Sequence, residues 1–502
     1  MNKAVLALTS RLTYGTNVSQ HHEEHKHGII ETLASVYEKA RNALEYRAEN
    51  LVRRAAIERI LKRLIILNKD PTYLSENLLT ELSWARYLSK SQITPPKQIE
   101  LTKILNKYTS YSGSVIPMDW IIKIASAEIE EVFNLNKDYS QFTFFTFQAI
   151  KQKVTIVDEN LDLLIFFAVD KVYAASDPEQ IAYHIISLAG ADINDEKMEE
   201  GWKLFKLASQ SKTLPRINKF VRRQMPPLIL LRDIYFYNPN DFKKTVSDKE
   251  LFLSKASEVL DNQLEQMTGR IGTAGFRSVL YVFLTKMVLA FGVEAPLEML
   301  ILGRLAMLPL IINLIFPPLL MWFATMQIKV PSQKERDLLV NRSWFIVENF
   351  DELKLEQDLL GEAPAEDKTN IIYWIFTTIY TLFFIGTFAF IYYILGLIGF
   401  TFLSKFIFVF FLTVIAFFAY RINQIAQVYS WKGIEHERSH LTDTVALPIL
   451  TIGSILSNGL SKLNFLGFVF DFILEAPFKL ILGFVDDWVQ FLSVKKEQQI
   501  LD

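Results

Sequence analysis

Two long runs without an ionisable side chain constrain this chain more than any other feature. Residues 305–325 and residues 371–398 contain no Asp, Glu, Lys, Arg or His. The hydrocarbon core of a bilayer is about 30 Å thick, and a helix needs roughly 20 apolar residues to cross it. Both runs reach this length, so the sequence predicts an integral membrane protein.

Two weaker segments extend this membrane block to about four spans. Residues 401–420 cross the bilayer if Lys405 extends its ammonium group to the interface. Residues 277–294 form the weakest candidate because they contain Lys286. We expect the first hairpin to pair 277–294 with 303–326.

The turn of this first hairpin is predicted at residues 294–298, and the second hairpin is predicted to turn at Gly399, between 371–398 and 401–420. If residues 279–293 only lie at the interface, the N-terminal region changes sides relative to the rest of the chain.

The remaining sequence is helical in pattern, so the predicted fold class is all-α. Apolar residues recur at three- and four-residue steps along 28–69, and Asp70-Pro71 ends that helix. Further helices are expected near 74–90, 98–109, 117–134, 140–174, 178–189, 194–211 and 247–268. The predicted parts are a water-facing helical region at 1–275, a membrane hairpin at 276–326, an acidic connector at 327–370, a second hairpin at 371–420, and a connector with interfacial helices at 421–502.

The C-terminal stretch 463–492 is predicted to be an amphipathic helix that lies along the membrane surface. Its charged residues Glu475, Lys479, Asp486 and Asp487 cluster on one helical face. Apolar side chains fill the rest of that helix, which is typical of a helix in the interface plane. The alternative is a helix packed against the membrane bundle.

Positive charge predicts the orientation in the membrane. Lys and Arg concentrate in segments that flank the spans on the cytoplasmic side. The turns of the predicted hairpins offer only Arg304 and Lys405. The opposite flanks carry Arg270, Arg277, Lys329, Lys334, Arg336, Arg421 and Lys432. We therefore expect a multi-pass protein of the cytoplasmic membrane with both termini in the cytoplasm.

Prolines occur within the second predicted span, at Pro309, Pro317 and Pro318. Proline removes helix hydrogen bonds and kinks a helix. A broken helix could line a substrate cavity, as in transporters. The pattern more simply predicts a kink in a packed bundle, because no acidic residue accompanies the prolines.

A metalloprotease-like pattern occurs at residues 436–440, where His436, Glu437 and His440 fit H-E-x-x-H. On a helix, the two histidines could ligate zinc and the glutamate could act as a general base. Arg438 places a cation beside the metal position, and no third ligand is evident. We therefore expect a surface connector that binds no catalytic metal. The histidine-rich segment 21–27 is likewise expected to be a solvated arm.

The most basic stretch is 206–232. It includes Lys212, Arg216, Lys219, Arg222 and Arg223 as candidate contacts for lipid headgroups or a partner. RNA is the alternative ligand, but lipid is preferred because the chain already sits in a membrane. The formal net charge of −2 gives no overall attraction to nucleic acid.

Several classes of chemistry are excluded or unsupported. The chain has no cysteine, which excludes disulfides, thiolate metal sites and a cysteine nucleophile. No P-loop, Gly-rich dinucleotide motif or Gly-x-Ser-x-Gly motif is present. No cofactor is expected.

Residues 281–290, 313–321 and 470–479 are apolar motifs through which the membrane half resembles uncharacterised multi-pass membrane proteins of candidate-phyla-radiation (Patescibacteria) bacteria. The resemblance covers roughly residues 276–495. It implies a bacterial membrane setting and assigns no catalytic residue.

The sequence favours a non-enzymatic, membrane-anchored scaffold whose helical region binds a protein partner. A transporter or channel subunit is the second hypothesis, and an H-E-x-x-H zinc protease is the third. A transporter should carry polar groups in mid-membrane, for which the sequence offers Lys286, Arg304 and Asn313. The oligomeric state is left open.

Overall fold

The computed structural model describes residues 2–13, 51–134, 137–190, 195–303, 307–328, 330–355, 360, 371–431 and 451. These residues are helical throughout, apart from loops and an isolated bridge between Val154 and Leu360. The predicted all-α fold is therefore confirmed. The described chain divides into two compact units, which we treat separately.

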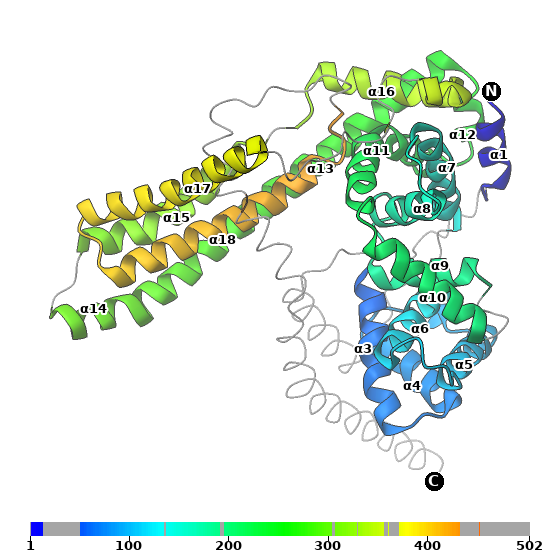
Figure 1. The fold of residues 1–502 in the computed structure, drawn as a ribbon, viewed down its shortest axis with the longest axis horizontal. Coiled ribbons are helices and arrows are strands. Elements are labelled where there is room, and N and C mark those ends of the chain that lie inside the picture. Colours follow the sequence, from blue (N-terminus) through cyan, green and yellow to red (C-terminus); the bar gives the residue numbers. More distant parts are fainter. Residues whose placement is uncertain are drawn as a thin grey trace, which may run out of the picture. The chain divides into compact units, whose positions relative to one another are not determined.

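The first unit contains the apolar helices (Figure 1). They are α13 (Lys249–Leu289), a π-helical turn η3 (Ala290–Glu294), α14 (Ala295–Leu302), α15 (Met307–Met326), α17 (Ile371–Leu397) and α18 (Phe402–Ala426). Four helices in the described part of the chain are long and apolar enough to cross a bilayer: Lys249–Leu300, Met307–Met326, Thr377–Leu397 and Phe402–Ala426. They indicate a multi-pass membrane protein.

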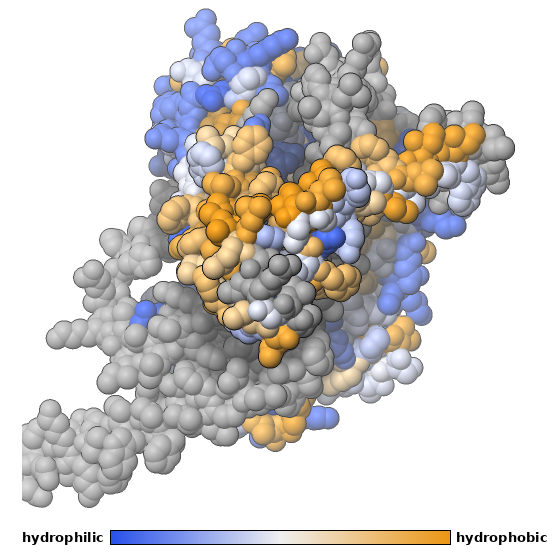
Figure 2. Space-filling model, turned by 90° about the vertical axis from the view of Figure 1, so that its left-hand side faces the viewer, coloured by the Kyte–Doolittle hydropathy of each residue, from blue (hydrophilic) through white to orange (hydrophobic). Residues whose placement is uncertain are grey.

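The outer surface of these helices suits a lipid environment. On α17, side chains such as Leu382, Phe390 and Tyr393 are each 64% exposed. Figure 2 shows apolar residues covering much of the end of the bundle that faces the viewer. Exposed apolar side chains of this density are costly in water and are accommodated in lipid.

The first hairpin does not turn where the sequence predicted. Residues 294–298 are helical, and the helix ends only at Leu302, with Gly303 in the left-handed conformation at φ +63°. Pro296 lies in the first turn of α14, where a missing backbone N–H is tolerated. The π turn before it closes through a bond from Ala295 N–H to Ala290 O. Pro296 suggested a loop, but the π turn widens the helix locally and the helix continues through this proline.

The second hairpin turns at Gly399, as predicted. Gly399 has a φ of +90°, a conformation that favours glycine. Thr401 then caps α18 by accepting a hydrogen bond from Ser404 N–H at 3.2 Å. We call the end of the bundle near Gly303 and Gly399 the turn end.

The rest of the first unit consists of less apolar helices. It comprises most of α1 (Lys3–Arg11), most of α11 (Leu214–Tyr237), α12 (Phe242–Thr245), α16 (Gln333–Glu348) and the 3-10 helix η4 (Phe350–Leu355). Of these helices, α12 and α16 pack against α13. Phe252 of α13 and Trp344 of α16 place their ring centroids 5.3 Å apart. Ser343 of α16 donates a 3.1 Å hydrogen bond to the carbonyl of Pro227 on α11.

Pro226 and Pro227 lie inside α11, where proline ordinarily breaks or kinks a helix. Their missing N–H groups leave the carbonyls of Arg222 and Arg223 without helix partners. Both arginines are exposed, so water can satisfy those carbonyls. The helix therefore continues for ten residues beyond Pro227, to Tyr237.

The second unit is a helical bundle of α3 (Val52–Leu67), α4 (Pro71–Trp84), η2 (Lys90–Gln92), α5 (Pro95–Thr109), α6 (Met118–Val132), most of α7 (Lys137–Lys153), α8 (Leu161–Val172), α9 (Pro178–Leu188) and α10 (Asp195–Gln210). Ile57, Leu78, Ile124 and Ile181 are among its fully buried core residues. The predicted helix end at Asp70-Pro71 is confirmed, because α3 ends at Leu67. Asp70 and Asp177 then cap the helices that follow them.

The sequence predicted one helix at 140–174, and this prediction is wrong, because the structure has two helices there, α7 and α8. α7 ends at Lys153, and Thr155 N–H then donates a hydrogen bond to Leu360 O at 2.8 Å. Asp158 then accepts a hydrogen bond from Asn160 N–H at 2.9 Å, which forms a turn before α8.

Candidate functional site

A cluster of polar side chains lies buried between the membrane helices of the first unit. Lys286, Glu294, Asn313 and Ser404 have no exposed surface, and Glu298 is 3% exposed. Charged side chains inside membrane spans are energetically costly and mark functional sites by default. We call these five residues the membrane polar cluster.

Helix geometry explains how three of these residues come to share one face. Lys286, Glu294 and Glu298 follow a four-residue spacing with the buried Ala290. In a regular α-helix this spacing drifts around the helix by about 40° per step. The π turn at Ala290–Glu294 adds a residue to one turn and offsets that drift. Single π turns occur frequently at functional sites.

The contacts join three segments of the chain. Asn313 Nδ2 on α15 donates to Glu294 Oε1 at 2.7 Å, and it lies 3.4 Å from the backbone carbonyl of Ser404. Ser404 Oγ and Thr401 Oγ1 donate to Glu298 Oε1 at 2.9 Å and 3.1 Å. The cluster therefore links the first hairpin to the start of α18.

The pair of Lys286 and Glu294 is less well satisfied. Lys286 Nζ lies 3.7 Å from Glu294 Oε2, too far for a strong hydrogen bond. Lys286 Nζ, Glu294 Oε2 and Asn313 Oδ1 are buried without a hydrogen-bond partner. The ammonium also lies 4.7 Å from the centre of the Phe411 ring. Unpaired buried polar atoms on three side chains point to an exchangeable proton or a small polar ligand.

The cluster extends along the bundle rather than lying at a single depth. Lys286 is eight residues before Glu294, or about 12 Å along the helix. Glu298 and Thr401 lie near the turn end, whereas the ring beneath Lys286 belongs to the middle of α18. From the sequence, Lys286 and Asn313 were predicted as polar groups in mid-membrane, but Glu294 and Glu298 were predicted to lie in a turn. The four-residue spacing from Lys286 was the available signal.

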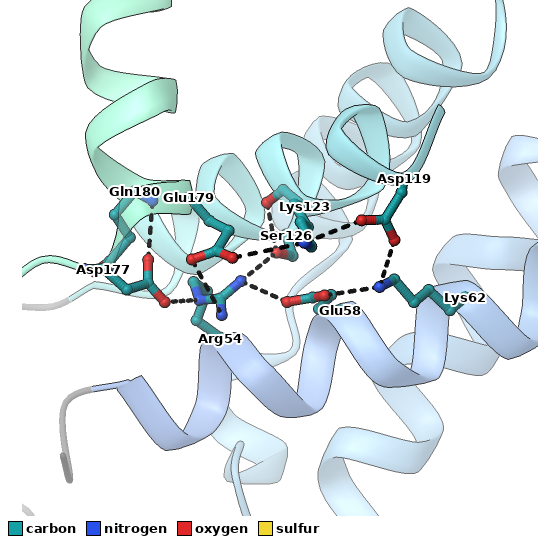
Figure 3. A network of polar contacts seen from close by, with 9 residues as sticks. All are labelled: Arg54, Glu58, Lys62, Asp119, Lys123, Ser126, Asp177, Glu179 and Gln180. Atoms are coloured by element: carbon teal, nitrogen blue, oxygen red, sulfur yellow. Dashed lines mark hydrogen bonds and ion pairs between the residues drawn. The ribbon is translucent and has the colours of Figure 1, made fainter. Parts of the chain in front are cut away.

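A second polar network lies in the other unit, around Arg54 of α3 (Figure 3). Arg54 is 1% exposed and contacts Asp177 at 2.6 Å through Nε. Its Nη1 donates to Glu58 at 2.8 Å and to Ser126 at 3.1 Å. Glu179 lies 4.0 Å from its Nη2. The network therefore connects α3, α6 and α9.

Three further charged side chains extend this network toward the solvent. Lys62 lies 3.0 Å from Glu58 and 2.7 Å from Asp119, and Lys123 lies 3.0 Å from Asp119 (Figure 3). Burial alone would lower the pKa of Arg54, but the surrounding carboxylates raise it above its usual value. Burial and Asp177 raise the pKa of Glu179. These contacts indicate that the network stabilises the fold, because every carboxylate in it lies near a cation.

His184 on α9 forms another buried contact in the same unit. Its Nδ1 lies 2.6 Å from Asp170 Oδ2, and its Nε2 lies 3.6 Å from Glu131. Burial alone would lower the pKa of His184, but the carboxylates of Asp170 and Glu131 raise it to about 10. His184 is therefore protonated at neutral pH and joins α8 to α9 by an ionic contact.

The predicted basic residues lie at the start of α11. Lys212, Lys219, Arg222 and Arg223 are exposed, and Arg216 is half-buried. Lys212 lies just before α11, whereas Arg216, Lys219 and Arg223 within it are spaced by three and four residues, which places these three on one helical face. We call Lys212, Arg216, Lys219, Arg222 and Arg223 the basic face.

The predicted kink prolines are all part of α15. Pro309, Pro317 and Pro318 are buried and lie within the helix, which continues through them to Met326. Asn313, one turn before Pro317, points its amide into the membrane polar cluster.

The H-E-x-x-H residues His436, Glu437 and His440, the segment 21–27 and the C-terminal helix 463–492 lie outside the described residues. Their assignments stay predictions. Comparison of the chain with protein-family models, with curated proteins and with solved structures finds no match.

Proposed function

We propose that this chain is a non-enzymatic membrane-anchored scaffold of a bacterial cytoplasmic membrane. Its helical region would face the cytoplasm and bind a protein partner there. The observation that carries this proposal is the continuity of α13, which belongs to the apolar bundle and also packs against α16. We infer that the half of α13 packed against α16 lies in water.

α13 contains 41 residues without a break. At about 1.5 Å per residue it is roughly 60 Å long, about twice the thickness of the hydrocarbon core. Its first half buries Phe252, Val259 and Leu264 against neighbouring helices. Arg336 of α16 adds a 3.0 Å hydrogen bond to Asp261. A bound partner would therefore be held at a defined height above the membrane.

The basic face supports the cytoplasmic placement of this region. The cytoplasmic leaflet carries negative charge, which attracts exposed basic residues. Lys212, Lys219, Arg222 and Arg223 are exposed and could contact lipid headgroups or an acidic surface of a partner.

Site-specific photo-crosslinking in native membranes tests the proposal. A photoreactive residue at Lys219 or Arg222 should give discrete crosslinked protein species of constant size. The matched control is a photoreactive residue at Leu382, an exposed position on α17. Crosslinks to lipid alone from all three positions would contradict a partner-binding role.

A transporter or channel subunit is the second candidate function. The membrane polar cluster favours it, because transport proteins place ionisable groups between helices inside the bilayer. Solute flux in proteoliposomes that is lost on Glu294→Gln would favour this candidate over the scaffold.

A further inference from the structure

We propose that Glu294 is a proton-binding site inside the membrane bundle, with Lys286 as its counter-charge. The proton would be exchanged with water at the turn end. This inference goes beyond the scaffold role and does not depend on it.

The two oxygens of Glu294 differ in their surroundings. Oε1 accepts the 2.7 Å hydrogen bond from Asn313, whereas Oε2 has no hydrogen bond and faces Lys286 at 3.7 Å. A buried carboxylate normally needs hydrogen bonds as well as a cation to offset its lost hydration. Oε2 is therefore the oxygen on which a proton would be added.

Proton uptake has a simple charge balance. An O–H bond forms at Glu294 Oε2, and the O–H bond of a hydronium ion breaks and leaves water. The pair changes from a neutral ion pair to a neutral acid beside a positive ammonium, so the site gains one unit of charge. No oxidant, reductant or metal is needed.

The Phe411 ring offers the Lys286 ammonium a second stabilising contact once Glu294 is neutral. Lys286 Nζ already lies 4.7 Å from the centre of the Phe411 ring. A desolvated cation over an aromatic face is attracted to the electron-rich face of the ring. Lys286 can therefore be stabilised by Glu294 in one state and by Phe411 in the other.

Polar groups continue from the site toward the turn end. Glu298 lies four residues beyond Glu294 and accepts hydrogen bonds from Thr401 and Ser404. Asn313, Thr401 and Ser404 are neutral hydrogen-bonding groups. Lys405 on α18 directs its ammonium to the Tyr392 ring at 4.2 Å. Arg304 lies outside the described residues.

A permanent ion pair is the competing interpretation. In that case Glu294 would stay ionised at every pH, and the cluster would only hold the two hairpins together. The two interpretations differ in whether a neutral carboxylic acid is ever present.

Infrared difference spectroscopy of the full chain in lipid nanodiscs distinguishes them. We expect the carbonyl band of a buried protonated carboxyl to appear as the pH falls, and to shift in D₂O. Glu294→Gln should abolish this band. Glu298→Gln should keep the band, because Glu294 remains.

The matched control is Glu258→Gln, which removes the exposed partner of Lys255 on the same helix α13. This variant should leave the band unchanged. If Glu294→Gln does not fold, the double variant Lys286→Met with Glu294→Gln removes both charges and should also lack the band. Absence of a titrating band in the wild-type protein, or its persistence in the Glu294 variants, would overturn the proposal.

Discussion

Tyr429, just beyond the end of α18, donates a 2.6 Å hydrogen bond to the carboxylate of Asp233 on α11. The two residues are 196 positions apart in sequence, and their bond is buried. It fixes the chain just beyond α18 to α11 of the first unit. Burial, together with Asp233, raises the pKa of the Tyr429 hydroxyl, so this group stays protonated and continues to donate.

Replacement Tyr429→Phe should therefore destabilise the first unit by about 1–3 kcal/mol, because Asp233 would lose a hydrogen bond without regaining water. The apparent Tm of the full chain in detergent measures the effect. Tyr237→Phe is the matched control, since that hydroxyl bonds Glu258 at 2.9 Å on an exposed surface. Equal Tm changes for the two variants would contradict this explanation.

Removal of Arg54 should unfold the second unit more readily than removal of its neighbour Lys62. Arg54→Met leaves Glu58, Asp177 and Glu179 buried without their common cation, at a cost of about 3–5 kcal/mol. Lys62 is 39% exposed, so Lys62→Met should cost about 1 kcal/mol or less. Thermal unfolding of both variants at neutral pH provides the comparison. A smaller loss for Arg54→Met than for Lys62→Met would show that the network is not a structural element.

The protonated state of His184 predicts a pH dependence. A group whose pKa rises from 6.5 to about 10 on folding contributes stability that is complete below pH 6.5. That contribution is lost as the pH rises through this interval toward 10. The wild-type Tm should therefore fall with rising pH by more than the Tm of His184→Gln does. Parallel profiles for the two proteins between pH 6.5 and 10 would contradict an ionic contact with Asp170.

Two glycines on α13 should respond in opposite directions to the same substitution. A Cβ at Gly275 would meet the Thr325 side chain of α15, which is held by a 2.9 Å hydrogen bond to Met321 O. Gly272 has open space around it. Gly272→Ala should raise stability by up to about 1 kcal/mol, because alanine favours helices. Gly275→Ala should lower it. A gain in Tm for both variants would contradict close packing of α13 on α15.

The sequence was sufficient for those features that depend on local chemistry. The uncharged runs at 305–325 and 371–398 predicted two spans, because unpaired polar groups are costly in lipid. Asp70-Pro71 predicted the end of a helix, because the residue before a proline disfavours helical backbone. The helix predicted at 178–189 begins at Pro178, where Asp177 caps the first turn.

Features that depend on tertiary contacts could not be predicted in the same way. Pro296 suggested a turn at residues 294–298, yet it lies in a continuous helical segment. The membrane polar cluster combines Lys286, Asn313 and Ser404 from three helices far apart in sequence. No local pattern specifies that convergence.

The central claim is that four helices span the membrane, with both turns on one face and the helical region on the other. The chain lacks cysteine, so single cysteines can report on each position without background. Suitable exposed sites are Met307 and Phe402 at the turn end, Glu258 and Gln333 in the water-facing part, and Leu382 on α17. Labelling with a membrane-impermeant thiol reagent should modify the first two from outside intact cells. The next two should react only after the membrane is opened, and Leu382→Cys should not react. Labelling of Met307→Cys and Phe402→Cys from opposite faces would contradict the account.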